Sequence, residues 1–263
     1  MTAGSVKFIS SRDNAWLKDL RRLARGNTAY REQGRIWVEG DHLCAAAMAR
    51  GVRPQVGVFA ESAWPQVAAE LARSAAQCVV VPDAWFAALS ALESPARMGF
   101  LFELPAPAAM RSGVPSVILD RVQDAGNVGS ILRSASAFGF KQVIALAGTA
   151  ALWSPKVLRA GMGAHWGLRL IEGLTVSALS ELGVPIVVTS SSSGVSLAVA
   201  LRGDSLPSPC AWVLGHEGQG VCAELQALAS LHIRIAQPGG EESLNVAAAA
   251  AICLHASAMA GAP

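Results

Sequence analysis

The sequence has few of the residues that hold small secreted domains and metal centres together. Its five cysteines form no CxxC pair, so we expect neither a disulfide framework nor a zinc site. The five histidines show no HxxxH or HxH spacing, and we expect no bound metal. Unpaired cysteines are typical of small buried side chains in a reducing compartment, which predicts a cytoplasmic protein.

Export and membrane signals are also scarce. The amino-terminal SVKFISSRDN lacks the apolar core of a cleavable signal. The most apolar run, residues 246–262, is mainly alanine, contains a histidine and has no basic flank. We interpret this run as a buried helix and expect no membrane partner.

Charged residues make up only 15% of the chain, but their distribution is uneven. Residues 1–53 contain ten basic and five acidic residues, whereas the remainder contains 11 basic and 14 acidic residues. Within residues 12–35 the apolar residues recur at helical spacing, so the basic side chains are expected to point outward. A polyanionic partner and an ordinary solvated helix face both explain this pattern.

Two α/β segments flank a proline-rich stretch. Residues 1–104 alternate short apolar strands with helices, and residues 105–116 contain three prolines and little periodicity. Beyond this linker, near-continuous apolar strands are expected at 117–119, 143–147, 186–189, 211–214 and 233–235. Such strands, separated by helices, predict a parallel sheet that is covered on both faces.

Glycine-rich polar loops follow three of these strands, at about residues 120–129, 215–221 and 236–245. In a parallel sheet such loops lie at the carboxyl edge, where ligands bind, and glycine lets the backbone approach a ligand closely. None of the loops contains GxxxxGK[ST], GxGxxG or GxSxG. The loops therefore predict a nucleotide-like ligand that is bound in another way.

Three segments resemble a known family. NVGSILRSASAFG, LGHEGQGV and SLNVAAAAA, in this order, resemble motifs 1, 2 and 3 of the SpoU (TrmH-like) RNA ribose 2′-O-methyltransferases of the SPOUT superfamily. SPKVLRAGMGA, residues 154–164, resembles the family's segment after its second strand. The resemblance implies an α/β protein with an L30e/L7Ae-like substrate-binding domain at 1–104, a linker at 105–116 and a trefoil-knotted methyltransferase domain at 117–263.

The resemblance also implies a function, with S-adenosylmethionine as cofactor, RNA as substrate (ribosomal in preference to transfer RNA) and a homodimer as the active form. By position, the catalytic residues would be Asn127, Arg133, Glu217, Ser243 and Asn245. The cofactor would contact Thr189, Leu214, Gly215, Gly218, Ile235 and Leu244. RNA would be held by Lys18, Arg21, Arg22 and Arg25.

Several alternatives remain open at this point. Arg133 is either a base for the ribose hydroxyl or a bidentate clamp on a phosphate, and the permanent charge of a guanidinium favours the clamp. Asn245 could be an ordinary helix cap, and Glu217 a solvated loop acid. The segment IAQPGG departs from the family's usual Ile-Pro-Met start of motif 3, which affects the expected cofactor contacts.

Two other functions compete with the methyltransferase. One is a non-catalytic RNA-binding protein on the same fold, and the other is a small-molecule enzyme that binds a dinucleotide. Intact motif residues argue against the first. The missing GxGxxG and the basic amino-terminal segment argue against the second.

Overall fold

The computed structural model describes residues 5–11, 13–67, 69–191, 193–240 and 243–260. The chain forms two compact units, one of residues 1–106 with 153–166 and the other of residues 107–152 with 167–263. Arg12 of the basic segment and residues 241–242 of the third predicted loop lie outside the described residues. None of the described helices is long and apolar enough to cross a membrane.

The first unit is built on a five-stranded mixed sheet. Its strand order is β1 (Ser5–Phe8), β4 (Gln77–Val81), β3 (Val56–Ala60), β5 (Met98–Glu103) and β2 (Arg35–Glu39). β5 runs antiparallel to both of its neighbours, whereas β1, β4 and β3 are parallel. The accompanying helices are α1 (Ala15–Arg25), α2 (Ala29–Gln33), α3 (Asp41–Ala49), η1 (Trp64–Gln66), α4 (Ala69–Ser74) and α5 (Asp83–Leu89).

Helix α1 forms where the basic segment predicts a helix. The Asn14 side chain caps it by accepting a hydrogen bond from the Trp16 amide at 3.0 Å. Leu17, Leu20 and Leu23 share one face and are buried. The basic side chains of α1 are therefore directed to the exposed face, as expected.

The segment 153–166 packs within the first unit although it lies between two strands of the second. It contains α7 (Pro155–Gly161) and the beginning of η2 (Ala164–Gly167). The ring of Trp166 lies 5.2 Å from that of Trp153 and 5.3 Å from that of Phe102, measured between centroids. A sequence-based division at residues 105–116 has no signal for this return of the chain.

The second unit is a seven-stranded sheet in which every pairing is parallel, and the predicted parallel α/β fold is therefore confirmed. Its order is β10 (Val195–Ser196), β12 (Leu231–Arg234), β9 (Ile186–Ser190), β11 (Ala211–Leu214), β6 (Ser116–Leu119), β7 (Gln142–Leu146) and β8 (Arg169–Leu174). The helices are α6 (Ala125–Ala137), η3 (Val176–Glu181), α8 (Leu197–Arg202), α9 (Ala223–Leu228) and α10 (Val246–Ala260).

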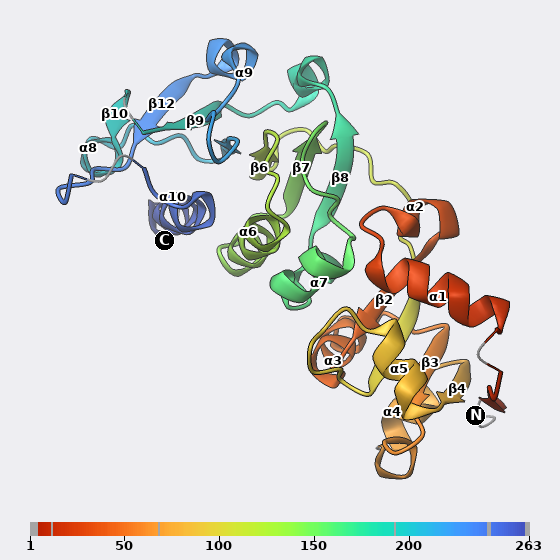
Figure 1. Ribbon diagram of the computed structural model, residues 1–263. Coiled ribbons are helices and arrows are strands. Elements are labelled where there is room, and N and C mark those ends of the chain that lie inside the picture. The colour runs from red at the N-terminus through yellow and green to blue at the C-terminus, as the bar shows by residue number, and fades with distance from the viewer. Residues whose placement is uncertain (1–4, 12, 68, 192, 241–242, 261–263) are drawn as a thin grey trace. The chain divides into compact units, whose positions relative to one another are not determined.

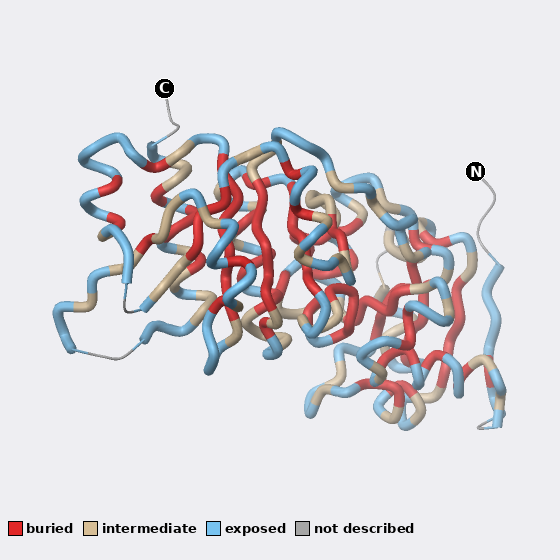
Figure 2. Tube along the Cα trace, turned by 90° about the horizontal axis from the view of Figure 1, so that it is seen from above, coloured by how far each residue is buried: buried red, intermediate tan, exposed pale blue. Residues whose placement is uncertain are grey.

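The strands of this sheet carry apolar side chains on both faces, so each face must be covered by helices. One face packs Ile118, Val188 and Val213 against Leu179 of η3 and Leu225 of α9. The opposite face carries α6 and α10, which lie side by side in Figure 1. Figure 2 shows the central strands as buried segments surrounded by exposed loops.

The pairing register brings the three glycine-rich loops to one edge of the sheet. Leu119 at the end of β6 pairs with Leu214 at the end of β11, and the Asp120 amide donates to the Leu214 carbonyl at 2.9 Å. β9 and β12 end beside them. The chain turns from β6 toward β7 on one side while β11 lies on the other, which is the arrangement that opens a ligand crevice in parallel sheets.

All five cysteines are free thiols, and four of them are buried. Burial raises the pKa of the Cys210 thiol to about 11 and that of Cys253 to about 12. These thiols are therefore protonated at neutral pH and behave as small apolar side chains.

Candidate active site

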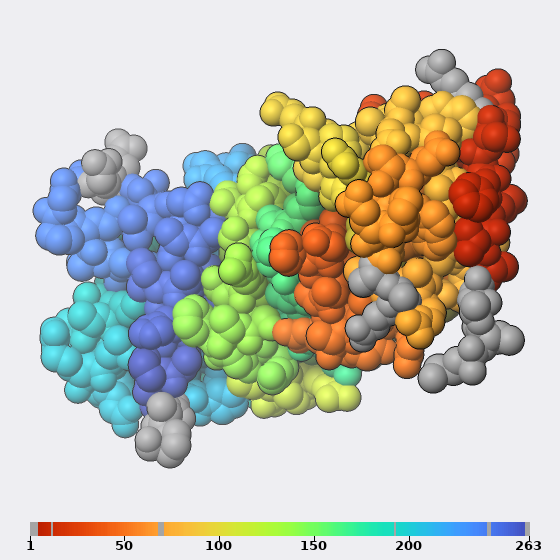
Figure 3. Space-filling model, turned by 90° about the horizontal axis from the view of Figure 1, so that it is seen from below, coloured from red at the N-terminus to blue at the C-terminus, as the bar shows by residue number. Residues whose placement is uncertain are grey.

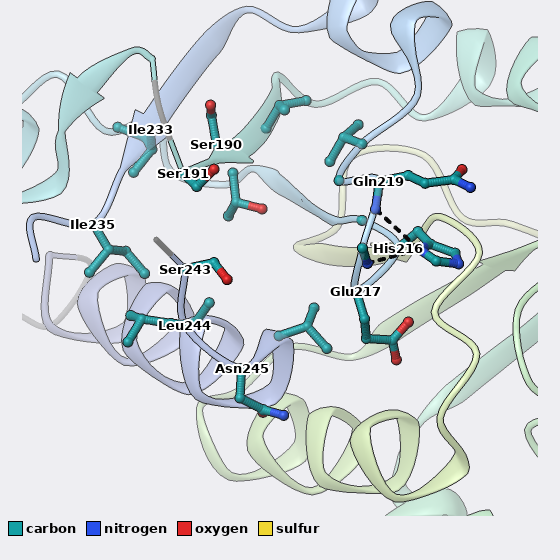
Figure 4. Close-up of a pocket in the computed structure, with 18 of the residues that line it drawn as sticks. Ser190, Ser191, His216, Glu217, Gln219, Ile233, Ile235, Ser243, Leu244 and Asn245 are labelled. Carbon is teal, nitrogen blue, oxygen red and sulfur yellow. Dashed lines mark hydrogen bonds between the residues drawn. The ribbon is translucent and has the colours of Figure 1, made fainter. Parts of the chain in front are cut away.

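A cavity of about 610 Å³ opens at the carboxyl ends of β9, β11 and β12 (Figure 4). Five of the six predicted cofactor residues line it, namely Thr189, Gly215, Gly218, Ile235 and Leu244. The sixth, Leu214, is fully buried inside β11 and lies behind the wall. The predicted residues thus surround one common space, with Leu214 as the exception.

The loop after β11 closes on itself. His216 and Gly220 exchange backbone hydrogen bonds of 3.1 and 2.8 Å. A Cβ at Gly215 would lie 2.3 Å from the carbonyl carbon of Gly220, so only glycine fits there. The His216 Nδ1 atom accepts from the amides of Gly218 and Gln219 at 3.0 and 3.2 Å. These bonds hold the loop in one shape.

Three predicted catalytic residues, one from each loop, form a hydrogen-bonded chain. Asn127 Nδ2 donates to Glu217 Oε1 at 3.1 Å, and Asn245 Nδ2 donates to Asn127 Oδ1 at 3.0 Å. The amides of Gln123 and Asp124 also donate to the Glu217 carboxylate, at 3.2 and 3.1 Å. Figure 4 shows the Glu217 carboxylate and the Asn245 amide both pointing toward α6.

The Glu217 carboxylate is held as an anion. Burial raises its pKa, but the hydrogen bonds from Asn127 and from the Asp124 amide outweigh burial, so the pKa lies below its ordinary value. Its contribution to stability is present above the unfolded-state pKa of about 4.3 and is lost as the pH falls through the lowered value. A carboxylate with a lowered pKa is a weak proton acceptor at neutral pH, so Glu217 is better suited to fixing the loops than to general-base catalysis.

Asn245 has two roles that the sequence left as alternatives. Its Oδ1 accepts from the amides of Ala247 and Ala248 at 2.9 and 3.2 Å, which is the geometry of an N-cap for α10. Its Nδ2 donates to Asn127 at the same time. Ser243 and Leu244, directly before it, are exposed and line the cavity.

Arg133 lies apart from this network. The Asp124 side chain caps α6 by accepting from the Asn127 amide at 2.8 Å, and Arg133 follows Asn127 by six residues. The two side chains are therefore roughly 120° apart around the helix axis. Arg133 is exposed, is not part of the cavity wall, and makes no hydrogen bond or ion pair with any described residue. Its guanidinium is free to meet an external anion.

The four predicted RNA-binding residues of the first unit differ in how far they are engaged. Lys18 pairs with Asp13 at 3.2 Å and Arg22 pairs with Glu32, both at the exposed surface. Arg25 donates to the Ser90 carbonyl at 3.0 Å. Arg21 is exposed and makes no such contact with the described residues. Exposed pairs of this kind are weak and are readily exchanged for a phosphate.

The structure also reveals polar residues near the cavity that the sequence analysis did not single out. Asp120 and Arg121 form an ion pair at the end of β6, with 2.9 Å between Arg121 Nε and Asp120 Oδ1. Gln237 lines the cavity with a buried Oε1 that has no hydrogen-bond partner among the described residues. Each belongs to a loop that the sequence had identified, but no motif spacing distinguished these positions. Among the described residues, no cluster of histidine, cysteine or acidic side chains could hold a metal ion.

A parallel α/β sheet whose loops after β11 and β12 line one cavity, with the loop after β6 hydrogen-bonded beside them, is typical of a class of cofactor-binding enzyme folds. Within that class, the family model described as "SpoU rRNA Methylase family" matches residues 115–255. The chain belongs to this family, and the resemblance expected from the three motifs is confirmed.

Relatives that span nearly the whole chain support this assignment. The chain is 28% identical to the 23S rRNA (guanosine(2553)-2′-O)-methyltransferase RlmP of Bacillus subtilis, over 95% of this chain and 98% of that protein. It is similar to the structure of an AdoMet-bound rRNA methyltransferase from Sinorhizobium meliloti, with a TM-score of 0.82, 27% identity and coverage of 99% and 100%. A TrmH-family protein of Porphyromonas gingivalis has a TM-score of 0.79 and 30% identity, with coverage of 94% and 98%.

The two roles of Asn245 are separable by substitution. We expect Asn245→Asp to keep the cap acceptor and the stability of the chain, while losing the donor to Asn127 and lowering methyl transfer. Asn245→Ala removes both and should lower the free energy of unfolding by about 1 kcal/mol. Urea denaturation and a transfer assay on both variants check this. Equal activity of Asn245→Asp and the wild type would leave Asn245 with the cap alone.

Proposed function

We propose that this protein transfers a methyl group from S-adenosylmethionine to a ribose 2′-hydroxyl of ribosomal RNA. The observation that carries the proposal is the hydrogen-bonded chain Glu217–Asn127–Asn245 beside the cavity. It joins all three motif loops, and membership of the family makes catalysis a better explanation than RNA binding alone. The named activities of the relatives support ribosomal RNA over transfer RNA as the substrate.

The cavity fits the cofactor. Its volume of about 610 Å³ is within the range of roughly 300–1,000 Å³ typical of small-molecule sites. Gly215 keeps one wall bare of side chain, and the unbonded Oε1 of Gln237 offers an acceptor to a ligand amino or hydroxyl group. Thr189 is less available as a donor because its hydroxyl already donates to the Val213 carbonyl at 2.9 Å. We infer that the cofactor is held by Gly215, Gly218, Ile235 and Leu244, and that Gln237 also contacts it. Leu214 supports the cavity wall from inside β11 without contacting the cofactor.

The chemistry that remains for the chain is mainly alignment. When bound, the cofactor supplies a methyl group on a sulfonium, which is already electrophilic. The protein must place the ribose hydroxyl in line with that methyl and accommodate loss of the hydroxyl proton. We infer that Glu217 and Asn127 fix the shape of loop 215–221, while Ser243 and Asn245 hold the target nucleotide.

Arg133 is best explained as a phosphate clamp. A guanidinium stays protonated at neutral pH, so acting as a base is costly, whereas its fork matches a phosphate in a bidentate manner. Its exposure and its lack of a protein partner among the described residues leave all of its donors free for RNA.

Methyl transfer from labelled S-adenosylmethionine to unmodified total RNA tests the function. After digestion, we expect a 2′-O-methylated nucleoside in the ribosomal fraction. Arg133→Ala should lower the rate roughly 100-fold, as misplacement of a reacting group does. Arg202→Ala, at an exposed arginine at the end of α8, is the matched control and should leave the rate unchanged.

Two other results would change the proposal. Most activity retained in Arg133→Lys would contradict both the clamp and the base, because lysine cannot reproduce the fork. Cofactor binding without methyl transfer to any RNA fraction would favour the non-catalytic RNA-binding protein.

We also propose that the first unit is an L30e/L7Ae-like domain that grips RNA through Lys18, Arg21, Arg22 and Arg25. The support is its basic α1, whose cations are all on the exposed side and whose ion pairs are weak. Contacts of this kind position RNA without selecting its sequence.

Salt dependence of RNA binding tests this grip. Arg21→Ala should weaken affinity and reduce the slope of log affinity against log salt by about 0.7–0.9, because one phosphate contact is lost. Arg53→Ala, at an exposed arginine outside α1, serves as the control. Unchanged affinity after replacement of all four α1 residues by alanine would refute the proposal.

The active form is proposed to be a homodimer in which α10 faces the partner. Ile252 and Met259, which are 41% and 57% exposed, lie on one face of α10 with His255 between them. Figure 3 shows α6 and α10 meeting at the surface of the second unit. These two side chains are available to pack against the same face of a partner.

Light scattering tests the dimer directly. We expect twice the chain mass for the wild type and the monomer mass for Ile252→Glu. Val199→Glu, at a valine 51% exposed on α8, should remain dimeric. A monomeric wild type at micromolar concentration would exclude the dimer.

The trefoil knot of the family is proposed for the second unit as well. Its support is the strand order, in which β11 lies between β6 and β9 while α10 packs on α6 and β11. An experimental chain trace decides this point. The cytoplasmic location stays a prediction of the cysteine content, and fractionation of cells tests it.

A further inference from the structure

Asp120 and Arg121 are neighbours in sequence that form an ion pair, and the backbone conformation of Arg121 is unusual. Successive side chains of extended backbone point to opposite sides, yet in the bend just after β6 the side chains of these two neighbours join at one carboxylate. Arg121 Nε and Nη2 donate to Asp120 Oδ1 and Oδ2 at 2.9 and 3.1 Å. This is possible because Arg121 has φ of +57°, in the left-handed region that a non-glycine residue rarely adopts. Such conformations persist where surrounding contacts impose them, and they cluster at functional sites.

The surrounding contacts are present on the side of β7. The Arg121 amide donates to Thr149 Oγ1 at 3.1 Å, and this hydroxyl donates to the Leu119 carbonyl at 2.9 Å. Gly148, with φ of +90°, passes beneath the arginine stem, where a Cβ would lie 3.1 Å from Arg121 Cγ. The guanidinium is thereby aimed away from β7 and toward the loop after β11.

The pair then grips that loop at its carboxyl-terminal half. Arg121 Nη1 donates to Gln219 Oε1 at 2.9 Å, and Nη2 approaches the Gly220 carbonyl at 3.4 Å. Asp120 Oδ2 accepts from the Cys222 amide at 2.7 Å. Glu217, earlier in the same loop, is held by Asn127 from the other side. Loop 215–221 is thus fastened at both ends to residues 120–127.

The opposite charges of Asp120 and Arg121 strengthen the contacts that hold loop 215–221. Asp120 is 2% exposed, and burial raises its pKa, but the hydrogen bonds from Arg121 and from the Cys222 amide lower the pKa more, to a value below the ordinary one. The same contact raises the pKa of Arg121. Asp120 is therefore a buried anion whose main countercharge is Arg121, so removal of the arginine disturbs the loop as well as the pair.

We propose that Arg121 is a positioning residue that, through Asp120, Gln219 and Gly220, fixes loop 215–221 in the shape that binds the cofactor. This inference rests on the proposed function, because loop 215–221 lines the cavity assigned to S-adenosylmethionine. Arg121 is not part of the cavity wall, but it would influence cofactor affinity through this loop.

Isothermal titration of the full chain with S-adenosylmethionine tests the proposal without RNA. Arg121→Met should raise the dissociation constant about 10-fold, and Arg121→Lys about 3-fold, since lysine restores the charge but not the fork. Arg169→Met is the matched control, because Arg169 also donates to a backbone carbonyl, that of Ala109 at 3.1 Å, but lies on β8. It should leave cofactor affinity unchanged.

Further measurements separate positioning from general stability. In transfer assays, Arg121→Met should raise the KM for S-adenosylmethionine and leave the KM for RNA unchanged. If Arg121→Met does not fold, the double variant Asp120→Asn, Arg121→Met removes the unpaired buried charge and should show the same loss of affinity. A lower Tm with unchanged cofactor affinity would show a purely structural role and overturn the inference. Failure of the wild type to bind S-adenosylmethionine would instead refute the proposed function.

Discussion

The site depends on the register between β6 and β11. These strands are far apart in sequence, yet Leu119 pairs with Leu214, so the residues that follow them begin at the same height on the sheet. A slip of one residue would turn every following side chain to the opposite face. The Trp212 ring of β11 donates from Nε1 to Ser257 Oγ at 2.8 Å, so β11 also holds the carboxyl-terminal half of α10. The glycine-rich loops inherit their positions from this pairing.

Two carboxylates link the loops that follow β6 and β11 and hold them together. Asp120 and Glu217 follow the paired strands, and both are saturated by donors. Glu217 accepts three hydrogen bonds from residues 123–127, and Asp120 accepts two from its neighbour Arg121 and one from the Cys222 amide. Saturation lowers both pKa values, so both groups remain anions and neither is poised to accept a proton at neutral pH. The site is therefore organised for alignment. This suits a reaction whose electrophile is already activated and whose main requirement is geometry.

The sequence predicts the second unit better than the first. Apolar runs such as 211–214 are buried on both faces, so their pattern alone identifies the central parallel strands. The strands it missed lack that signal. β8 is an edge strand that is only partly buried, and β10 has two residues. In the first unit, β1 is exposed at all four residues, and β5 is buried but antiparallel and follows an irregular stretch. The return of residues 153–166 to the first unit depends on tertiary packing of Trp166, which no local pattern encodes.

The residues of the candidate site also divide into those that the sequence predicts and those that only the structure reveals. Asn127, Glu217 and Asn245 were found because their motifs resemble a family, and the structure brings them into one hydrogen-bonded chain. Arg121 has no such signal, because its left-handed backbone and its reach to Gly220 arise only after β6 and β11 have paired. Gln237 belongs to the part of motif 3 that departs from the family. A buried acceptor without a hydrogen-bond partner among the described residues is costly, and a donor group of the ligand proposed for the cavity would satisfy it.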